Sequence, residues 1–313
     1  MSPRPAATAH GVLLADKPAG WSSFDVVRYV RPLFRPAKVG HTGTLDPLAT
    51  GLLPLVIGEA TKLVRFLASA HKTYRAVLTL GTATDTLDAE GRVVETRPVP
   101  ALSAEDCRRV LSGFLGRIEQ TPPRFSALRR EGKRFYELAR AGVDAEPPSR
   151  QVIIERLQLL ELRPPRLEFE VSCGAGTYVR SLAADIATAL GTVGHLSALV
   201  RLETDGWSLE QARPVQELDR GNPGQALLPL DEVLARFPRY DLSARLAEQL
   251  AHGRGLDARQ LEQLLAGHPP ASNPVWLRSP AGNLHVLASI AREPAERGFS
   301  MKFERTLKIK EKR

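Results

Sequence analysis

Residues 40–51 have the sequence Gly40-His41-Thr42-Gly43-Thr44-Leu45-Asp46-Pro47-Leu48-Ala49-Thr50-Gly51, which surrounds one carboxylate with glycines, threonines and a proline. The stretch has the apolar periodicity of neither a helix nor a strand, so it predicts a loop, called here the Asp46 loop. The apolar residues 52–57 follow at once and predict a buried strand that holds the end of this loop. Asp46 is therefore a candidate reactive group. The alternative is a turn initiator, because Asp and Pro are favoured at adjacent turn positions.

The composition is that of a globular protein with a basic surface. Of the 313 residues, 43% are hydrophobic and 25% charged, which allows one large domain or a large domain and a small one. The net charge of +8 favours a polyanionic partner, either nucleic acid or an acidic membrane surface. No apolar run approaches the roughly 20 residues that span a bilayer, and residues 1–10 lack the apolar core of a signal peptide. We therefore expect a cytoplasmic protein. The two cysteines suggest neither a disulfide framework nor a zinc site.

Alternating apolar residues predict strands at 71–80, 152–162 and 167–171, with helices inserted between strands at irregular intervals. This pattern favours an α+β fold with a mixed, mostly antiparallel sheet and flanking helices over a doubly wound sheet. Prolines punctuate residues 209–241, where we place a boundary between domains 1–235 and 236–313. The second of these is predicted to be a small α+β domain.

Residues 121–140 carry six arginine or lysine residues against two glutamates, with Phe125, Phe135 and Tyr136 between them. Such a mixture can hold phosphates and stack on bases, which favours a nucleic-acid contact. A solvated amphipathic helix with its aromatic residues in the core is the alternative, and both interpretations stay open. The candidate RNA-binding residues of this segment are Arg124, Phe125, Arg129, Arg130, Lys133 and Arg134.

Residues 174–182 lead into a predicted helix with Val179 and Leu182 on its apolar stripe, and Arg180 lies off that stripe near the helix start. A cation is unfavourable at that end of the helix dipole, so we expect an anionic partner. The alternative is an exposed arginine, either by chance or as a surface phosphate contact. Residues 81–91 include two aspartates, Asp85 and Asp88, but their spacing lacks the ligand count of a calcium loop and favours a plain polar loop.

Several stretches in a fixed order resemble the bacterial tRNA pseudouridine-55 synthases, the TruB family. Any one of them is weak on its own, but the ordered set is highly specific and spans residues 11 to 210. The C-terminal residues resemble, more weakly, a PUA-type RNA-binding module. The matching stretches are residues 15–23, the Asp46 loop, Lys72-Thr73-Tyr74, residues 81–91, Pro122 to Leu128, and Gly176 to Leu182.

The resemblance implies a pseudouridine synthase-like catalytic domain with an RNA-gripping insertion at about 121–150, followed by a PUA-like domain. It implies that Asp46 attacks the target nucleoside, that Arg180 keeps Asp46 charged and aimed, and that Tyr74 stacks on the base and helps remove the C5 proton. His41 resembles a residue that takes the place of the flipped-out nucleotide. We also expect Lys17, in the turn after the first strand, to contact RNA.

The reaction implied is isomerisation of uridine 55 in the TΨC arm of tRNA, with no metal or organic cofactor, no membrane and no obligate protein partner. Three alternatives remain. The first is a tRNA-binding or RNA-folding chaperone on the same scaffold, and the second is a guide-RNA-dependent pseudouridine synthase. The third is an aspartate-dependent hydrolase of a small molecule, which would not show salt-sensitive RNA binding.

Overall fold

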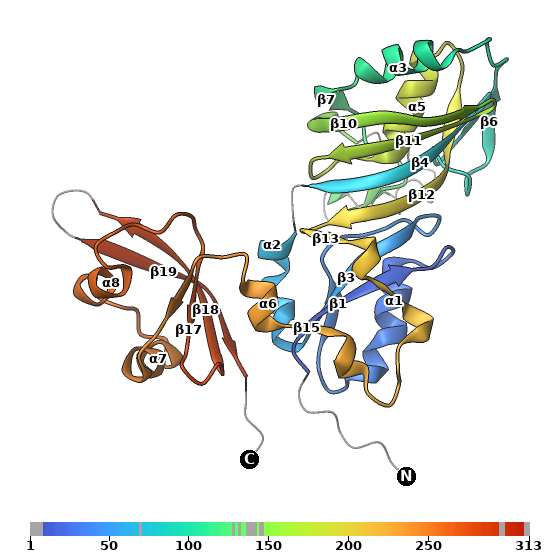
Figure 1. Ribbon diagram of the computed structural model, residues 1–313. Coiled ribbons are helices and arrows are strands. Elements are labelled where there is room, and N and C mark those ends of the chain that lie inside the picture. Colours follow the sequence, from blue (N-terminus) through green and yellow to red (C-terminus); the bar gives the residue numbers. More distant parts are fainter. Residues whose placement is uncertain are drawn as a thin grey trace.

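The computed structural model describes residues 9–68, 71–126, 129–130, 133–135, 143, 147–293 and 298–309. Over these ranges a large sheet and a smaller, four-stranded sheet form two units, each with helices packed against it (Figure 1). The predicted α+β fold class is confirmed, and within the described ranges no helix is long and apolar enough to cross a membrane.

The large sheet has eleven strands, and most neighbours in it are antiparallel. Parallel pairing occurs between β1 and β14 and between β3 and β12. Three short strands lie off the main path: β2 (Val39–His41) beside β3, β13 (Trp207–Ser208) beside β12, and β15 (Leu227–Pro229) beside β1. The strands of the main path, in order of pairing, are β14 (Arg213–Pro214), β1 (Gly11–Lys17), β3 (Thr50–Ile57), β12 (Gly194–Thr204), β4 (Lys72–Leu80), β11 (Arg166–Cys173), β10 (Arg150–Arg163) and β7 (Gly116–Gln120).

The strand predicted at 71–80 is the central strand β4. Its apolar residues alternate in the sequence because one face of the strand is buried. Tyr74, Ala76 and Leu78 are buried on one face, while the residues between them are more exposed. Tyr74 is paired with Val171 of β11 on one side and with Arg201 of β12 on the other. The middle of the sheet therefore fixes the position of the Tyr74 side chain.

Two helices of the large unit begin with the same capping motif. Ser22 caps α1 (Ser23–Val30) and Ser103 caps α3 (Ala104–Ser112), each in a capping box with an aspartate three residues later. The third long helix, α5 (Val179–Ala189), packs its buried face on β4 and β12, and α3 lies beside it (Figure 1). The shorter helical segments are η1 (Arg31–Phe34), η2 (Gly58–Leu63), α2 (Val64–Leu67), η3 (Leu209–Gln211), η4 (Val215–Glu217), η5 (Pro223–Ala226) and α6 (Leu230–Leu234).

Residues 121–150 include a two-stranded hairpin, formed by β8 (Arg129–Arg130) and β9 (Lys133–Arg134). The amphipathic helix considered for this segment is therefore wrong at residues 129–130 and 133–134. Phe135 is buried, whereas Tyr136 and Arg140 lie outside the described residues. A second hairpin, of β5 (Thr82–Thr84) and β6 (Val93–Thr96), carries the polar loop predicted at 81–91.

The C-terminal unit is a four-stranded sheet with two helices, and its composition of elements is compatible with a PUA-like domain. Trp276, Leu287 and Leu307 of this unit pack with Leu230 and other apolar residues of the large unit. In Figure 1 the unit lies beside α2 and α6. Its elements are β16 (Arg239–Asp241), α7 (Ala244–Ala251), α8 (Ala258–Leu265), β17 (Val275–Arg278), β18 (Leu284–Arg292) and β19 (Phe299–Lys308).

Candidate active site

A pocket of about 810 Å³ lies where the Asp46 loop, β4, the loop after β5 and the start of α5 meet. Segments that are far apart in the sequence thus share one cavity. The side chains of Asp46, Tyr74 and Arg180 all line it, as do those of Asp88 and Phe125. Its remaining lining residues are Ser22, Thr44, Leu45, Pro47, Thr86, Glu90, Ser126, Arg150, Gly176, Thr177, Tyr178, Val179 and Leu199.

The Asp46 loop is held from behind by Arg201 of β12, which is fully buried. Arg201 Nε donates to the Leu52 carbonyl at 2.7 Å, Nη2 to the Gly43 carbonyl at 3.3 Å and Nη1 to the Thr44 carbonyl at 3.4 Å. A Cβ atom at Gly51 would lie 2.5 Å from the Arg201 carbonyl oxygen, and the φ of Gly51 is +97°. Only glycine fits this close approach of the loop to β12.

Lys17 connects the Asp46 loop, at Pro47, to the turn after β1. The side chain is fully buried, and its ammonium donates to the carbonyls of Trp21 at 2.6 Å, Pro18 at 3.0 Å and Pro47 at 3.2 Å. Burial is the largest influence on this group and lowers the pKa of Lys17 to about 8, against the opposing effect of Asp46. The structure corrects the expectation that Lys17 contacts RNA, because the ammonium is enclosed by loop carbonyls.

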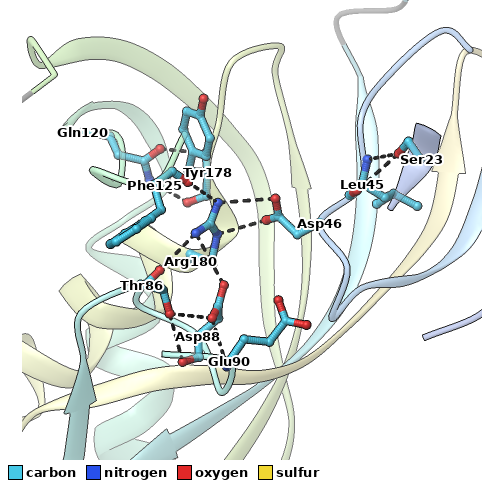
Figure 2. Close-up of polar contacts among 10 residues, drawn as sticks. All are labelled: Ser23, Leu45, Asp46, Thr86, Asp88, Glu90, Gln120, Phe125, Tyr178 and Arg180. Atoms are coloured by element: carbon cyan, nitrogen blue, oxygen red, sulfur yellow. Dashed lines mark hydrogen bonds and ion pairs between the residues drawn. The ribbon is translucent and has the colours of Figure 1, made fainter. Parts of the chain in front are cut away.

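Helix α1 makes a further connection to the loop through Ser23. The Ser23 hydroxyl accepts a hydrogen bond from the Leu45 N–H at 2.8 Å and donates to the Leu45 carbonyl at 3.2 Å (Figure 2). The Ala49 N–H donates to the Asp46 carbonyl at 3.1 Å. Asp46 is thus a turn residue and a pocket residue at once, and the turn presents its carboxylate.

Arg180 faces Asp46 across the pocket (Figure 2). Arg180 Nε forms an ion pair with Asp46 Oδ2 at 2.9 Å, and Nη2 donates to Oδ1 at 3.3 Å. The Arg180 side chain is only 6% exposed, whereas that of Asp46 is 36% exposed. The expected anionic partner is present, and the alternative of an exposed arginine is wrong. The carboxylate faces the pocket, and the guanidinium is buried behind it.

Asp88, assigned from the sequence to a plain loop, is a second partner of Arg180. Its Oδ2 lies 3.4 Å from Arg180 Nη1, and its side chain is 5% exposed. Asp88 Oδ1 accepts from the Thr86 hydroxyl at 2.6 Å and from the Glu90 N–H at 3.1 Å. Two sequence features pointed toward this region, namely the aspartates in residues 81–91 and the resemblance of that stretch to the family. Neither feature identifies Arg180 as the partner of Asp88.

Backbone carbonyls and a buried glutamine complete the setting of Arg180. Nη1 donates to the Thr86 carbonyl at 3.0 Å and Nη2 to the Phe125 carbonyl at 3.1 Å. Gln120 accepts from the Tyr178 N–H at 2.8 Å and donates to the Tyr178 carbonyl at 3.1 Å, which fixes the first turn of α5 (Figure 2). Arg180 therefore has little freedom to move away from Asp46.

Tyr74 forms another wall of the pocket and is 7% exposed. Burial raises the pKa of Tyr74 to about 12, although Arg201 acts in the opposite direction. The phenol is therefore neutral at physiological pH. Its ring can provide an apolar face for a flat ligand, and its hydroxyl can donate one hydrogen bond.

The other predicted contacts are divided between the pocket and its surroundings. Phe125 lines the pocket, and Arg124 next to it is exposed. His41 ends β2 and is partly buried, and burial followed by the nearby Arg201 lowers its pKa. The His41 Nδ1 atom is buried without a hydrogen-bond partner among the described residues. The side chains of Arg129, Arg130, Lys133 and Arg134 lie outside the described part of the structure.

Cofactor chemistry was not expected from the sequence. Within the described ranges, no group of three or more His, Cys, Asp or Glu side chains is arranged to hold a metal ion. The charged residues that line the pocket are three carboxylates, on Asp46, Asp88 and Glu90, and two guanidiniums, on Arg150 and Arg180. Asp46 and Asp88 both pair with Arg180. Burial raises the pKa of Glu90, and the neighbouring Asp88 and Asp46 act in the same direction.

Comparison with known proteins gives a consistent answer. The family model "TruB family pseudouridylate synthase (N terminal domain)" matches residues 31–179. A tRNA pseudouridine synthase B from Thiobacillus denitrificans is 47% identical over 265 residues, which are 82% of this chain and 89% of that protein. The protein of the same name from Nitrosococcus oceani is 45% identical over 257 residues, 80% of this chain and 83% of that protein.

Solved structures agree with this result at the level of the fold. A chain in the crystal structure of a Cbf5–Nop10–Gar1 complex superimposes with a TM-score of 0.68 at 23% identity, covering 95% of this chain and 84% of that one. The sequence relatives carry the assignment further, because their identity is high over most of both chains. The chain belongs to the TruB family of pseudouridylate synthases.

Proposed function

We propose that this enzyme isomerises uridine 55 in the TΨC arm of tRNA to pseudouridine, with Asp46 as the nucleophile. The observation that carries the proposal is the partly exposed carboxylate of Asp46, held in a pocket against the buried Arg180. The names of the relatives, tRNA pseudouridine synthase B, support tRNA as the substrate. The position of the uridine rests on the family resemblance of the Asp46 loop and of the other matching stretches.

The chemistry requires an ionised carboxylate close to the reacting nucleoside. Asp46 attacks either C1′ of the ribose or C6 of the uracil as the C1′–N1 bond breaks and N1 takes the electron pair. The base then turns, and C5 forms the new bond to C1′. The bond to Asp46 breaks with its electron pair returning to the carboxylate, the C5 proton leaves, and N1 takes up a proton. Arg180 forms an ion pair with Asp46 and fixes its direction, since both Asp46 oxygens face the guanidinium.

Tyr74 takes part as a neutral phenol. Its ring forms a pocket wall on which the uracil can stack. Because burial raises the pKa of Tyr74 to about 12, a phenolate is a minor species at neutral pH. If Tyr74 Oη accepts the C5 proton, it must pass its own proton on at the same time. Stacking alone makes no such demand, so Tyr74→Phe separates the two roles.

The pocket selects an uncharged ligand, and the surrounding surface selects a polyanion. The three carboxylates of the pocket outnumber its two guanidiniums, on Arg150 and Arg180, which disfavours a phosphate there, whereas a flipped-out uracil is neutral. Unstacking that base costs a few kcal/mol, which contacts outside the pocket must offset. We assign this work to His41 and Arg124 with the basic residues of the hairpin, Arg129, Arg130, Lys133 and Arg134, and Phe125 adds a contact from the pocket wall.

The two units divide the binding of RNA between them. In this proposal residues 1–235 form the catalytic domain, with an RNA-gripping insertion at about 121–150. Residues 236–313 form a PUA-like domain that contacts a different part of the tRNA. The enzyme acts in the cytoplasm, and it needs neither a guide RNA nor a protein partner.

The test uses purified protein and an unmodified tRNA transcript, with pseudouridine mapped along the RNA. The wild-type chain should convert uridine 55 with no other component present. Asp46→Asn should abolish conversion and leave the dissociation constant for tRNA within about threefold, because the amide keeps the shape but not the charge. Asp85→Asn is a matched control, because Asp85 lies in a neighbouring loop, pairs with Arg92 and does not line the pocket.

Full activity of Asp46→Asn would refute the nucleophile. Conversion only after a guide RNA is added would favour the guide-dependent alternative, and tRNA binding by the wild type without any conversion would favour the chaperone.

A further inference from the structure

The outward side of α1 and of Arg31, the residue that caps its C-terminus, carries an aromatic residue and two arginines that the proposed mechanism does not use. Phe24, Arg28 and Arg31 are all exposed and are separated by four and then three residues. This spacing places them along one side of a helix. We call these three residues the α1 stripe. An exposed phenylalanine beside an arginine on a helix is unusual for a surface that only faces water.

Phe24 is among the most exposed large apolar side chains of the described residues, at 56%. The Arg28 guanidinium lies 5.3 Å from the centre of the Phe24 ring, in cation–π geometry. The Arg28 side chain is itself 70% exposed, and its ion pair with Asp25, at 3.6 Å, is long. The stripe thus offers both an aromatic surface and accessible positive charge, with Asp25 as the acidic neighbour.

The α1 stripe lies next to the pocket. Ser22, two residues before Phe24, caps the helix and lines the pocket. Ser23, one residue before Phe24, holds the Asp46 loop through both polar atoms of the Leu45 backbone. Any polymer whose reacting unit enters the pocket therefore passes close to α1. The exposed cations Arg35 and Lys38 continue the positive charge beyond the helix.

We propose that the α1 stripe is a second RNA-binding surface of the enzyme, on which a nucleotide flanking the target uridine is held. The base of that nucleotide stacks on Phe24, and the adjacent phosphates lie against Arg28 and Arg31. Aromatic stacking and arginine–phosphate contacts are the two interactions that hold single-stranded nucleic acid without regard to sequence. The proposal rests on RNA being the substrate, and it assigns an RNA contact to residues outside the pocket and outside segment 121–150.

Helix α3 provides a matched control within the same chain. It begins with the same capping box, and Arg109 pairs with Asp106 three residues earlier, as Arg28 does with Asp25. The Arg109 side chain is 74% exposed, close to the value for Arg28, but α3 contributes no residue to the pocket lining. Arg109→Ala therefore removes a similar charge from a similar helix away from the pocket.

The experiment measures tRNA binding and steady-state turnover for Phe24→Ala, Phe24→Tyr, Phe24→Leu, Arg28→Ala and Arg109→Ala. The tRNA carries 2-aminopurine at one position flanking the target uridine at a time. Phe24→Ala should weaken binding about tenfold, mainly through KM, and should remove the fluorescence change at one flanking position. Phe24→Tyr should restore both, and Phe24→Leu should not. Arg28→Ala should lower the slope of log affinity against log salt by about one, while Arg109→Ala leaves it unchanged.

The proposal is overturned if Phe24→Ala binds tRNA like the wild type, or if Phe24→Leu restores binding as well as Phe24→Tyr does. It is also overturned if Phe24→Ala changes only the sedimentation of the protein, which would make the α1 stripe a protein contact. Failure of the proposed reaction looks different. In that case the wild type forms no pseudouridine, but Phe24→Ala still weakens RNA binding and removes the fluorescence change.

Discussion

Two buried arginines, Arg180 and Arg201, contact the Asp46 loop, and their guanidinium groups have different partners there. Arg180 faces two carboxylates, those of Asp46 and Asp88, and forms one wall of the pocket. Arg201 donates to three backbone carbonyls behind the loop and is fully buried. The difference suggests a division of roles. Arg180 provides the cation that pairs with the loop's carboxylate, and Arg201 holds the backbone of the loop in its shape.

The strongest test of this division is removal of the Arg180 cation. Arg180→Met leaves the carboxylates of Asp46 and Asp88 without the cation with which both form ion pairs. We expect the single-turnover rate to fall about 10³-fold, the upper end of the loss seen when a preorganised catalytic donor is deleted. Arg180→Lys keeps the charge and should retain part of the rate. A rate for Arg180→Met within tenfold of the wild type would contradict the electrostatic role.

Removal of Arg201 should give the converse result. Arg201→Met leaves the carbonyls of Gly43, Thr44 and Leu52 without their donor in a buried place. We expect the free energy of unfolding, measured by urea denaturation, to fall by about 3 kcal/mol, since each buried unsatisfied group costs about 1–3 kcal/mol. At temperatures where the variant is folded, its single-turnover rate should fall less than that of Arg180→Met. Equal losses of rate in Arg180→Met and Arg201→Met would contradict the division of roles between the two arginines.

The elements of the fold were predictable where local pattern and tertiary burial agree. The alternation in β4 is a local feature, and the structure has this strand where the sequence predicts it. Strand β12 was not predicted although it lies beside β4 in the sheet. Its pairing with β4 shifts register at two places, and Arg201 points inward, so the sequence shows no regular apolar alternation.

The pocket was predictable only in part, because its residues meet through tertiary contacts. Asp46, Tyr74 and Arg180 were identified through the family resemblance, and the structure brings all three to one pocket. Asp88 was missed, since its importance depends on a guanidinium far along the chain. Lys17 was placed in a turn and expected to contact RNA, and the three carbonyls around it come from backbone geometry that composition does not reveal.

A smaller loss of single-turnover rate is expected when Asp88, the second carboxylate paired with Arg180, is changed. Asp88→Asn keeps the size of the side chain but removes the second carboxylate, so the buried guanidinium loses one of its two anionic partners. The single-turnover rate should fall about tenfold, because charge-assisted hydrogen bonds contribute about 1.5–3 kcal/mol and the carbonyls of Thr86 and Phe125 remain. Thr86→Val, which removes only a neutral donor to Asp88, is the control and should cost less. A loss for Asp88→Asn as large as that for Arg180→Met would mean that Asp88 itself acts in the chemistry.

The smallest effect concerns Lys17, which also holds loop carbonyls but, unlike Arg201, can lose its proton. Burial lowers the pKa of Lys17 to about 8, below that of a lysine in the unfolded chain. Between about pH 8 and 10 the unfolded chain therefore binds more protons at this site, so the contribution of Lys17 to the free energy of unfolding rises with pH. Urea denaturation at pH 7.5, 8.5 and 9.5 should show this rise for the wild type relative to Lys17→Met, in which Lys72 and Tyr74 still titrate.

Activity should change in the opposite direction over the same range. A neutral amine has two N–H donors for the three carbonyls that the ammonium now satisfies, so the Asp46 loop loses a hydrogen bond as pH rises. The single-turnover rate should then decline above about pH 8 while the protein becomes harder to unfold. Lys17→Arg, which stays charged, should move this decline to higher pH if it folds. If the single-turnover rate and the free energy of unfolding rise or fall together with pH, another group titrates. Opposite trends indicate a group such as Lys17, whose charged form holds the loop although its burial disfavours that charge.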